Sequence, residues 1–144
     1  WIAKAAAKLQ GQQTSGVCTI AQKAATAAFN SDGQTTRQMC EAFKRRRDLF
    51  VKGISGINGF KINVPQGAFY LFPDITHFLG LHFNEQVVAT ADDFAMYLLN
   101  NAHVAVVSGS AFGSPSNIRL SYATSDEKLS MAVERIAQAV KLLR

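Results

Sequence analysis

The sequence predicts a mixed α/β (α+β) protein, in which a helical first third precedes a small sheet of about four strands with helices packed on it. Three observations predict this class. Residues 1–29 are rich in alanine, which is a strong helix former. Residues 60–122 contain several short alternating or wholly apolar segments, which are typical of strands. Residues 125–144 carry apolar side chains at helical spacing.

Three helices are expected before the sheet. Two alanine-rich stretches, 1–13 and 19–29, are separated by the turn-prone Thr14-Ser15-Gly16. A long helix over 35–55 follows the break at 30–33. Its apolar side chains form one stripe at helical spacing: Met39, Phe43, Phe50, Ile54 and Ile57.

The sheet is expected to begin with a hairpin. Segments 60–64 and 68–72 read as strands, joined by a turn at Pro65-Gln66-Gly67. The second strand is apolar on both faces, which predicts an internal position covered by helices. Two further strands are expected at 103–107 and 117–122.

Two more helices complete the prediction. Thr90 and Asp93 form a capping-box-like opening for a helix that ends near Asn101. The sequence Thr124-Ser125-Asp126-Glu127 supplies a cap and an acidic first turn for the final helix, which reaches the basic Lys141 and Arg144.

Composition excludes several classes of protein. A chain of 144 residues with 48% hydrophobic and 17% charged positions can bury one core without metals or disulfides. It has no run of eighteen apolar residues and no secretory leader, so we expect a soluble protein without a membrane partner. Cys18 and Cys40 lack paired spacing and should be free thiols in a reducing compartment, and the scattered histidines make a metal site unexpected. Trp1 stands where a methionine would, with no capping residue ahead of it, which indicates a cut boundary.

The net charge of +5 and the basic run 44–47 raise the question of an acidic partner such as a nucleic acid. The preferred interpretation is that this run forms the solvated back of the long helix, because no aromatic platform or nucleic-acid motif accompanies it. Arg46 falls inside the apolar stripe instead. We expect its stem to pass the apolar neighbours and its charge to reach water, in preference to a buried ion pair.

Arg119 is the candidate for binding chemistry. In segment 117–122 the even positions are apolar and the odd positions are polar, so Arg119 lies on the polar face of a strand. That pattern alone favours an ordinary solvent-facing side chain. The alternative is that the planar guanidinium binds a carboxylate through two parallel hydrogen bonds, with the glycine-rich loop 108–113 leaving room for a small ligand. The same loop makes a poor phosphate cradle, because it has no P-loop lysine and joins two strands.

Five ordered motifs change this balance: Gln12-Gln13-Thr14-Ser15 with Ile20-Ala21-Gln22, Arg45-Arg46-Arg47-Asp48, Pro65-Gln66-Gly67-Ala68-Phe69-Tyr70, Val106-Val107-Ser108-Gly109-Ser110-Ala111-Phe112-Gly113, and Asn117-Ile118-Arg119-Leu120-Ser121-Tyr122-Ala123-Thr124. With these motifs in this order, the chain closely resembles the class I aminotransferases, in their bacterial aspartate aminotransferase branch, over essentially its whole length.

The resemblance implies a homodimeric, cytoplasmic enzyme of fold type I that moves an amino group between an amino acid, most commonly aspartate, and 2-oxoglutarate. Its cofactor would be pyridoxal 5'-phosphate held on a lysine. Arg119 would bind the α-carboxylate of the substrate, which reverses the preference for a solvent-facing role. The family's cofactor lysine lies upstream of this chain, and Lys4 and Lys8 do not match its motif. The chain alone is therefore expected to bind no cofactor and to be inactive.

The resemblance also implies a division of the chain. Residues 1–33 would be the end of a large cofactor domain, and 34–144 a bridging helix with the small domain that closes over substrate. The first two helices would then lack their packing partner. Thr14 and Ser15 match a loop that approaches the partner subunit's active site. Ser108 departs from the family, which usually has proline there, and loss of the fixed backbone angle is expected to loosen the loop beside Arg119. The competing hypothesis is a non-enzymatic module that binds an anion or a protein through residues 44–47.

Overall fold

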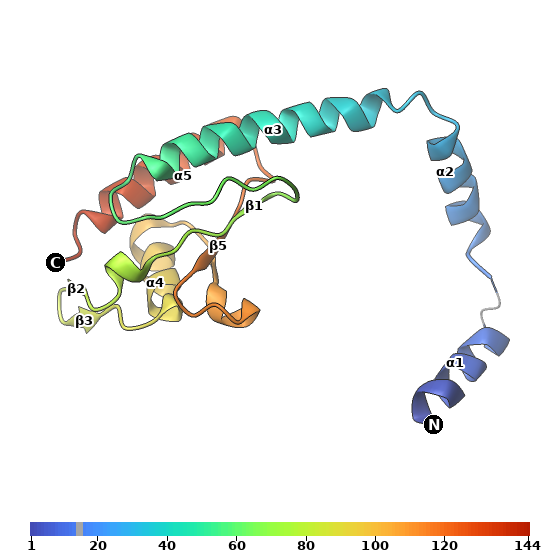
Figure 1. The fold of residues 1–144 in the computed structure, drawn as a ribbon, viewed down its shortest axis with the longest axis horizontal. Helices are drawn as coiled ribbons and strands as arrows, with labels where there is room; N and C mark the ends of the chain where they lie inside the picture. The colour runs from blue at the N-terminus through green and yellow to red at the C-terminus, as the bar shows by residue number, and fades with distance from the viewer. Residues whose placement is uncertain (14–15) are drawn as a thin grey trace. The chain divides into compact units, whose positions relative to one another are not determined.

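The computed structural model describes residues 1–13 and 16–144, drawn in Figure 1. The chain divides into two compact units, Trp1–Met39 and Cys40–Arg144. The boundary falls inside helix α3, which runs over Gln34–Ser55.

The first unit consists of helices. α1 covers Ile2–Gln13 and α2 covers Thr19–Phe29, as predicted, and α3 begins after the break at residues 30–33. Neither α1 nor α2 contains a buried residue. The predicted turn at Thr14 and Ser15 lies outside the described residues.

The second unit contains short strands and the remaining helical elements. In chain order they are β1 (Tyr70–Leu71), the 3-10 turn η1 (Thr76–Phe78), β2 (His82–Phe83), β3 (Gln86–Val87), α4 (Ala91–Tyr97), the π-helical turn η2 (Leu98–Ala102), β4 (Val107–Ser108), the 3-10 turn η3 (Gly109–Phe112), β5 (Ile118–Ser121) and α5 (Asp126–Val140).

The prediction of one four-stranded sheet is wrong in detail. The main sheet has three strands in the order β1-β5-β4, all antiparallel, and β2 pairs with β3 in a separate hairpin. The expected strand at 60–64 is reduced to a single bridge from Lys61 to Asp74. The chain leaves the sheet after this bridge, and the carbonyl of Pro65 accepts a hydrogen bond from Arg47 on α3 at 3.2 Å.

Two other strand predictions also need correction. The expected strand at 103–107 survives only at Val107, because His103 adopts a left-handed conformation at the end of the π turn and redirects the chain. The segment 68–72 is not internal: β1 is an edge strand of the sheet, and Phe72 remains 38% exposed. β5, which was predicted from its alternation, is the central strand.

The core of this unit is formed by the apolar sides of α3, α4, α5 and the sheet. α3 and α5 pack closely, since a Cβ added at Gly53 of α3 would lie 2.6 Å from the Val133 side chain of α5. Met39 is 55% exposed, so the apolar stripe of α3 is buried only in its later part. The largest buried side chains are Phe50, Ile54, Leu71, Ile75, Phe94, Leu98, Ile118, Tyr122, Leu129 and Ile136.

Both predicted capping signals are confirmed. At the start of α4, the Thr90 hydroxyl accepts a hydrogen bond from the Asp93 N–H, and the Asp93 carboxylate accepts one from the Thr90 N–H. At the start of α5, the Ser125 hydroxyl accepts a hydrogen bond from the Lys128 N–H at 3.4 Å. Each cap satisfies a helix N–H that would otherwise lack a partner.

Candidate functional site

Arg119 lies on β5, on the face of the central strand that points away from the core. Its neighbours Ile118 and Leu120 are 0% and 2% exposed, whereas Arg119 is only partly buried. Ser121, two residues further on, pairs with Tyr70 of β1, and Arg119 itself pairs with Val107 of β4. The predicted alternation is thus confirmed, and it places the guanidinium between two neighbouring strands.

Two aromatic rings contact the Arg119 guanidinium. Its central carbon Cζ lies 4.5 Å from the centre of the Tyr70 ring and 4.6 Å from the centre of the Phe112 ring. Tyr70 comes from β1, and Phe112 comes from η3, the turn that follows β4. Both distances are well inside the range of cation–π contact. We call these three residues the arginine clamp.

The charge of Arg119 has no counter-ion among residues 1–13 and 16–144. The ion pairs of this part of the chain join Lys44, Arg45, Arg46 and Arg47 to Asp48 and Asp126. Arg119 makes neither an ion pair nor a hydrogen bond to a described residue. Its N–H groups are therefore available to an external acceptor, and a carboxylate is the acceptor that fits their fork.

The loop after β4 holds Phe112 in place. Ser108, the last residue of β4, caps this turn: it has φ −57°, its side chain is buried, and its hydroxyl accepts a hydrogen bond from the Ser110 N–H at 3.3 Å. Gly109 is required by close packing, because an added Cβ would overlap the carbonyl oxygens of Ser114 and Asn117. Gly113 ends the turn with φ 74°, a conformation that favours glycine.

The expectation that Ser108 loosens the loop stays a prediction, and the structure shows two features that bear on it. The φ of Ser108 lies where proline would place it, so the backbone angle is retained without the ring. The hydroxyl cap supplies a restraint that proline could not. The loop is also fastened by Asn117, whose amide donates to the Phe72 carbonyl at 3.1 Å and accepts from the Ser114 hydroxyl at 2.7 Å. The loop forms a 3-10 turn that carries an aromatic ring beside Arg119.

Two carboxylates pair with the basic run 44–47, although Lys44 and Arg45 stay 70% and 60% exposed. Asp126 at the start of α5 accepts hydrogen bonds from Arg45 at 2.9 Å and from Arg46 at 3.3 Å. Asp48 accepts from Lys44 at 3.2 Å and from Arg47 at 2.7 Å. Hydrogen bonding from Arg45 lowers the pKa of Asp126, and hydrogen bonding from Arg47 lowers the pKa of Asp48.

Arg46 matches neither of the two arrangements considered for it, because its charge is paired but the pair is not buried: Asp126 is 31% exposed. Its side chain is only 27% exposed and ends on Asp126, with its guanidinium 5.8 Å from the Phe43 ring. An ion pair at the edge of the core is favoured here because Asp126, in the first turn of α5, lies within reach of α3. Two carboxylates thus offset part of the positive charge at 44–47, which weakens the case for an anion-binding module there.

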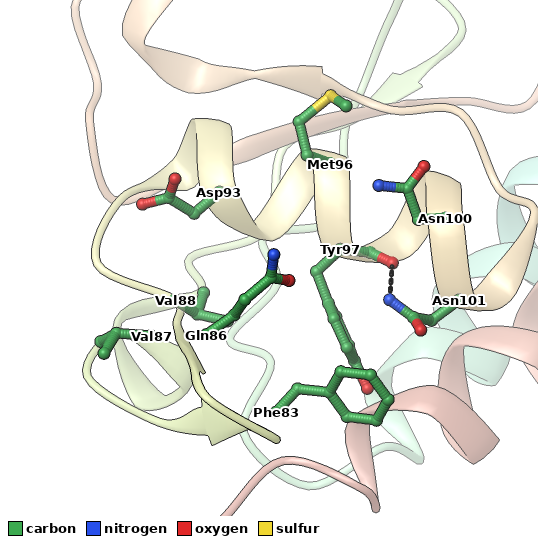
Figure 2. A pocket seen from close by; sticks show the side chains of 9 residues that line it. All are labelled: Phe83, Gln86, Val87, Val88, Asp93, Met96, Tyr97, Asn100 and Asn101. Atoms are coloured by element: carbon green, nitrogen blue, oxygen red, sulfur yellow. Dashed lines mark hydrogen bonds between the residues drawn. The ribbon is translucent and has the colours of Figure 1, made fainter.

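A hollow of about 540 Å³ lies beside α4 and the β2–β3 hairpin (Figure 2). Asn101 projects from the π turn and donates a hydrogen bond to the Tyr97 carbonyl at 3.1 Å, as the dashed line in Figure 2 shows. The one charged lining residue is Asp93, which the cap of α4 already uses. This hollow offers no cation to a carboxylate, so the arginine clamp is the better candidate site.

The structure also describes the two cysteines and the side chains that could bind a metal ion. Cys18 and Cys40 are free and exposed. Within the described part of the chain, no group of three or more His, Cys, Asp or Glu side chains could hold a metal ion. No helix there is long and apolar enough to cross a membrane.

The pattern of the family described as "Aminotransferase class I and II" matches residues 1–136. The chain belongs to this family. The aspartate aminotransferase of Rhizobium meliloti (strain 1021) is 46% identical over 137 residues, which cover 94% of this chain and 33% of that protein. A bifunctional aspartate aminotransferase and glutamate/aspartate-prephenate aminotransferase of Petunia hybrida is 41% identical over 141 residues, covering 95% and 29%.

Solved structures agree with this assignment. The crystal structure of the Rhizobium meliloti aspartate aminotransferase matches 98% of this chain and 36% of its own, with a TM-score of 0.90 and 44% identity. An aromatic aminotransferase of Pyrococcus horikoshii matches 93% of this chain and 34% of its own, with a TM-score of 0.81 and 34% identity. The chain spans about a third of the length of these relatives.

The family implies pyridoxal 5'-phosphate in its full-length enzymes. The residues of this chain do not by themselves fit that cofactor. All eight lysines are exposed, including Lys4 and Lys8 on α1. A lysine that forms a Schiff base is normally held in a desolvated pocket, and no lysine of this chain is buried in one.

Sequence reasoning proposed Arg119 as a binding residue and did not name its aromatic neighbours Tyr70 and Phe112. Tyr70 ends the family motif 65–70, and Phe112 lies inside the family motif 106–113. The available signal was the strand alternation, because Tyr70 shares a face with Arg119 once β1 and β5 are paired. The register of that pairing was not visible in the sequence.

Proposed function

We propose that this chain is the C-terminal, carboxylate-binding part of a pyridoxal-phosphate aminotransferase. The enzyme moves an amino group between aspartate and 2-oxoglutarate, and Arg119 binds the α-carboxylate of the substrate. The observation that carries this proposal is the arginine clamp: a guanidinium fixed beside two rings and without a counter-ion in the described part of the chain. Relatives named as aspartate aminotransferases support the choice of substrate.

The role of this chain's own residues is to bind and orient. Arg119 donates two parallel hydrogen bonds to one carboxylate, which fixes the substrate's position and plane. The cofactor supplies the electron sink for amino transfer when it is bound, and it is held by residues outside this chain. Dicarboxylic substrates suit a positively charged site, but recognition of the second carboxylate is not assigned to any residue here.

The proposal extends to the organisation of the whole enzyme. Residues 1–33 end a large cofactor domain, and 34–144 form the bridging helix and the small domain. The absence of buried residues in α1 and α2 supports a packing partner outside this chain. The enzyme is a cytoplasmic homodimer whose partners are small amino and 2-oxo acids.

The test compares this chain with a version extended upstream through the family's lysine segment. Absorbance near the aldimine band after addition of pyridoxal phosphate, followed by an aspartate transamination assay, should give a band and activity only in the extended protein. An extended protein that neither binds the cofactor nor transaminates would contradict the proposed activity.

In the extended enzyme, Arg119→Ala should reduce kcat/KM for aspartate about hundredfold, because two charge-assisted hydrogen bonds are lost. Arg135→Ala is the matched control. Arg135 is an exposed arginine on α5 with no ion pair among the described residues, and its loss should leave kcat/KM nearly unchanged. Equal effects of the two substitutions would remove Arg119 from the binding role.

A further inference from the structure

The two rings of the arginine clamp differ in origin but converge on one group. Tyr70 is held by β1, whose register with β5 is set by the pairs Tyr70 with Ser121 and Leu71 with Leu120. Leu71 is fully buried, so the strand that carries Tyr70 is anchored in the core. This ring therefore has a fixed position relative to β5.

Phe112 depends on the loop after β4. It is the last residue of η3, which follows the capping Ser108 and precedes Gly113. The ring also contacts Phe72, with 6.0 Å between ring centres and an edge-to-face angle of 84°. Phe112 is 49% exposed, so its contacts with Arg119 and Phe72 account for its position better than burial does.

An arginine that binds a carboxylate through two hydrogen bonds must present its plane correctly. A free arginine side chain has several rotatable bonds, and each must be fixed before binding is productive. Rings stacked against a guanidinium restrict its rotation while its edge N–H groups stay free to donate. Arg119 has these contacts and no competing hydrogen bond within the described residues.

We propose that Tyr70 and Phe112 are positioning residues that hold the Arg119 guanidinium in its carboxylate-binding orientation, with Phe112 set in place by the capped turn from Ser108 to Gly113. This proposal rests on the proposed function of Arg119. It adds that the glycine- and serine-rich loop serves the site through its aromatic ring, which contacts the guanidinium.

The test uses this chain, with the Arg119 Nε–Hε resonance followed by ¹⁵N NMR and assigned by its loss in Arg119→Lys. Two quantities are measured: the mobility of the Nε–Hε group without ligand, and the Kd for succinate from the shift of this resonance. Phe112→Leu should increase the mobility and weaken succinate binding about fivefold, as expected for loss of one cation–π contact. Tyr70→Leu should act in the same direction.

Two variants separate positioning from general structural damage. Phe112→Tyr keeps a ring over the guanidinium. It should therefore keep the low mobility of the Arg119 Nε–Hε group and the succinate affinity of the unsubstituted chain. Phe83→Leu removes a ring that packs against Tyr97, 5.2 Å away between centres, and should change neither quantity.

The outcomes are distinguishable. Unchanged Arg119 mobility in both Phe112→Leu and Tyr70→Leu, with succinate binding intact in the unsubstituted chain, would overturn the positioning role alone. Succinate that fails to shift the Arg119 resonance in the unsubstituted chain would instead overturn the carboxylate-binding function on which the proposal rests. Increased mobility together with weaker binding, restored by Phe112→Tyr, would establish the clamp.

Discussion

Helices α2 and α5, one from each unit, differ in capping and in the burial of their side chains. α2 begins after Cys18, whose side chain makes no capping hydrogen bond, and it buries no residue. α5 begins after the capping Ser125, carries two acidic residues in its first turn, and buries Leu129, Ile136 and Ala139. Both sequences favour a helix, but only α5 combines that preference with packing.

A helix-forming sequence does not by itself make a stable helix. Isolated helices of the length of α1 and α2 are marginal in water, because nucleation is unfavourable and most helical stability in proteins comes from packing. Ile20 and Phe29 are 79% and 90% exposed, so their apolar surface contributes little within this chain.

The largest effect is expected from aromatic truncation in the core. Phe94 is fully buried and stacks on Phe78 with 5.1 Å between ring centres. Phe94→Ala should lower the free energy of unfolding by about 3 to 5 kcal/mol, through lost burial and the cavity left behind. Phe29→Ala should change it by less than about 0.5 kcal/mol. Urea denaturation followed by far-UV circular dichroism measures both changes in the free energy of unfolding. Similar changes for the two substitutions would contradict the difference between the units.

Replacing a glycine with alanine should destabilise the second unit and stabilise helix structure in the first. Gly109→Ala forces a Cβ against backbone carbonyls that cannot easily move, and should destabilise the second unit by about 1 to 3 kcal/mol. Gly11 lies within α1 with no atom within 4 Å of an added Cβ. Gly11→Ala should therefore raise helix content, by up to about 1 kcal/mol of helix propensity. Thermal unfolding and far-UV circular dichroism report the two signs.

A side-chain cap can be removed from α5 and introduced into α2 by single substitutions. Ser125→Ala removes the hydroxyl that accepts the Lys128 N–H, and should cost about 1 kcal/mol. Cys18→Ser offers α2 a side-chain acceptor that it now lacks, and should increase its helicity slightly. Loss of stability on Ser125→Ala with no gain on Cys18→Ser would show that α2 is limited by packing alone.

The smallest effect is expected from the exposed charges that join α3 to α5. The pKa of Asp126 is lowered chiefly by its hydrogen bond from Arg45, so its contribution is present above the unfolded pKa near 3.9 and is lost as pH falls through the lower folded value. Asp126→Asn should reduce the steepness with which stability falls below about pH 4. Asp92→Asn, which removes an acid with no ion pair among the described residues, should not.

Sequence reasoning succeeded where local chemistry decides the structure. The cap at Thr90, the cap and acidic turn at 125–127, and the alternation around Arg119 depend on neighbouring residues, and all are present. It failed at 60–64 and 103–107, because a strand exists only where a partner pairs with it. The partner of Arg46 could not be foreseen, since Asp126 is 80 residues away in the chain.

The candidate site was predictable to a similar degree. Arg119 came from alternation together with family motifs, whereas Tyr70 required knowledge of strand register and Phe112 required the shape of a loop. The π turn at Leu98–Ala102 was also invisible, because its apolar pattern resembles that of an ordinary helix.

The strand order has a consequence for how the protein is made. β5 lies between β1 and β4 in the sheet but follows both along the chain. During synthesis from the N-terminus, β1 and β4 therefore emerge before the strand that joins them, and neither can pair within the sheet until residues 118–121 have left the ribosome. Arg119 arrives on that last strand, so its clamp can assemble only after Tyr70 and Phe112 have already been synthesised.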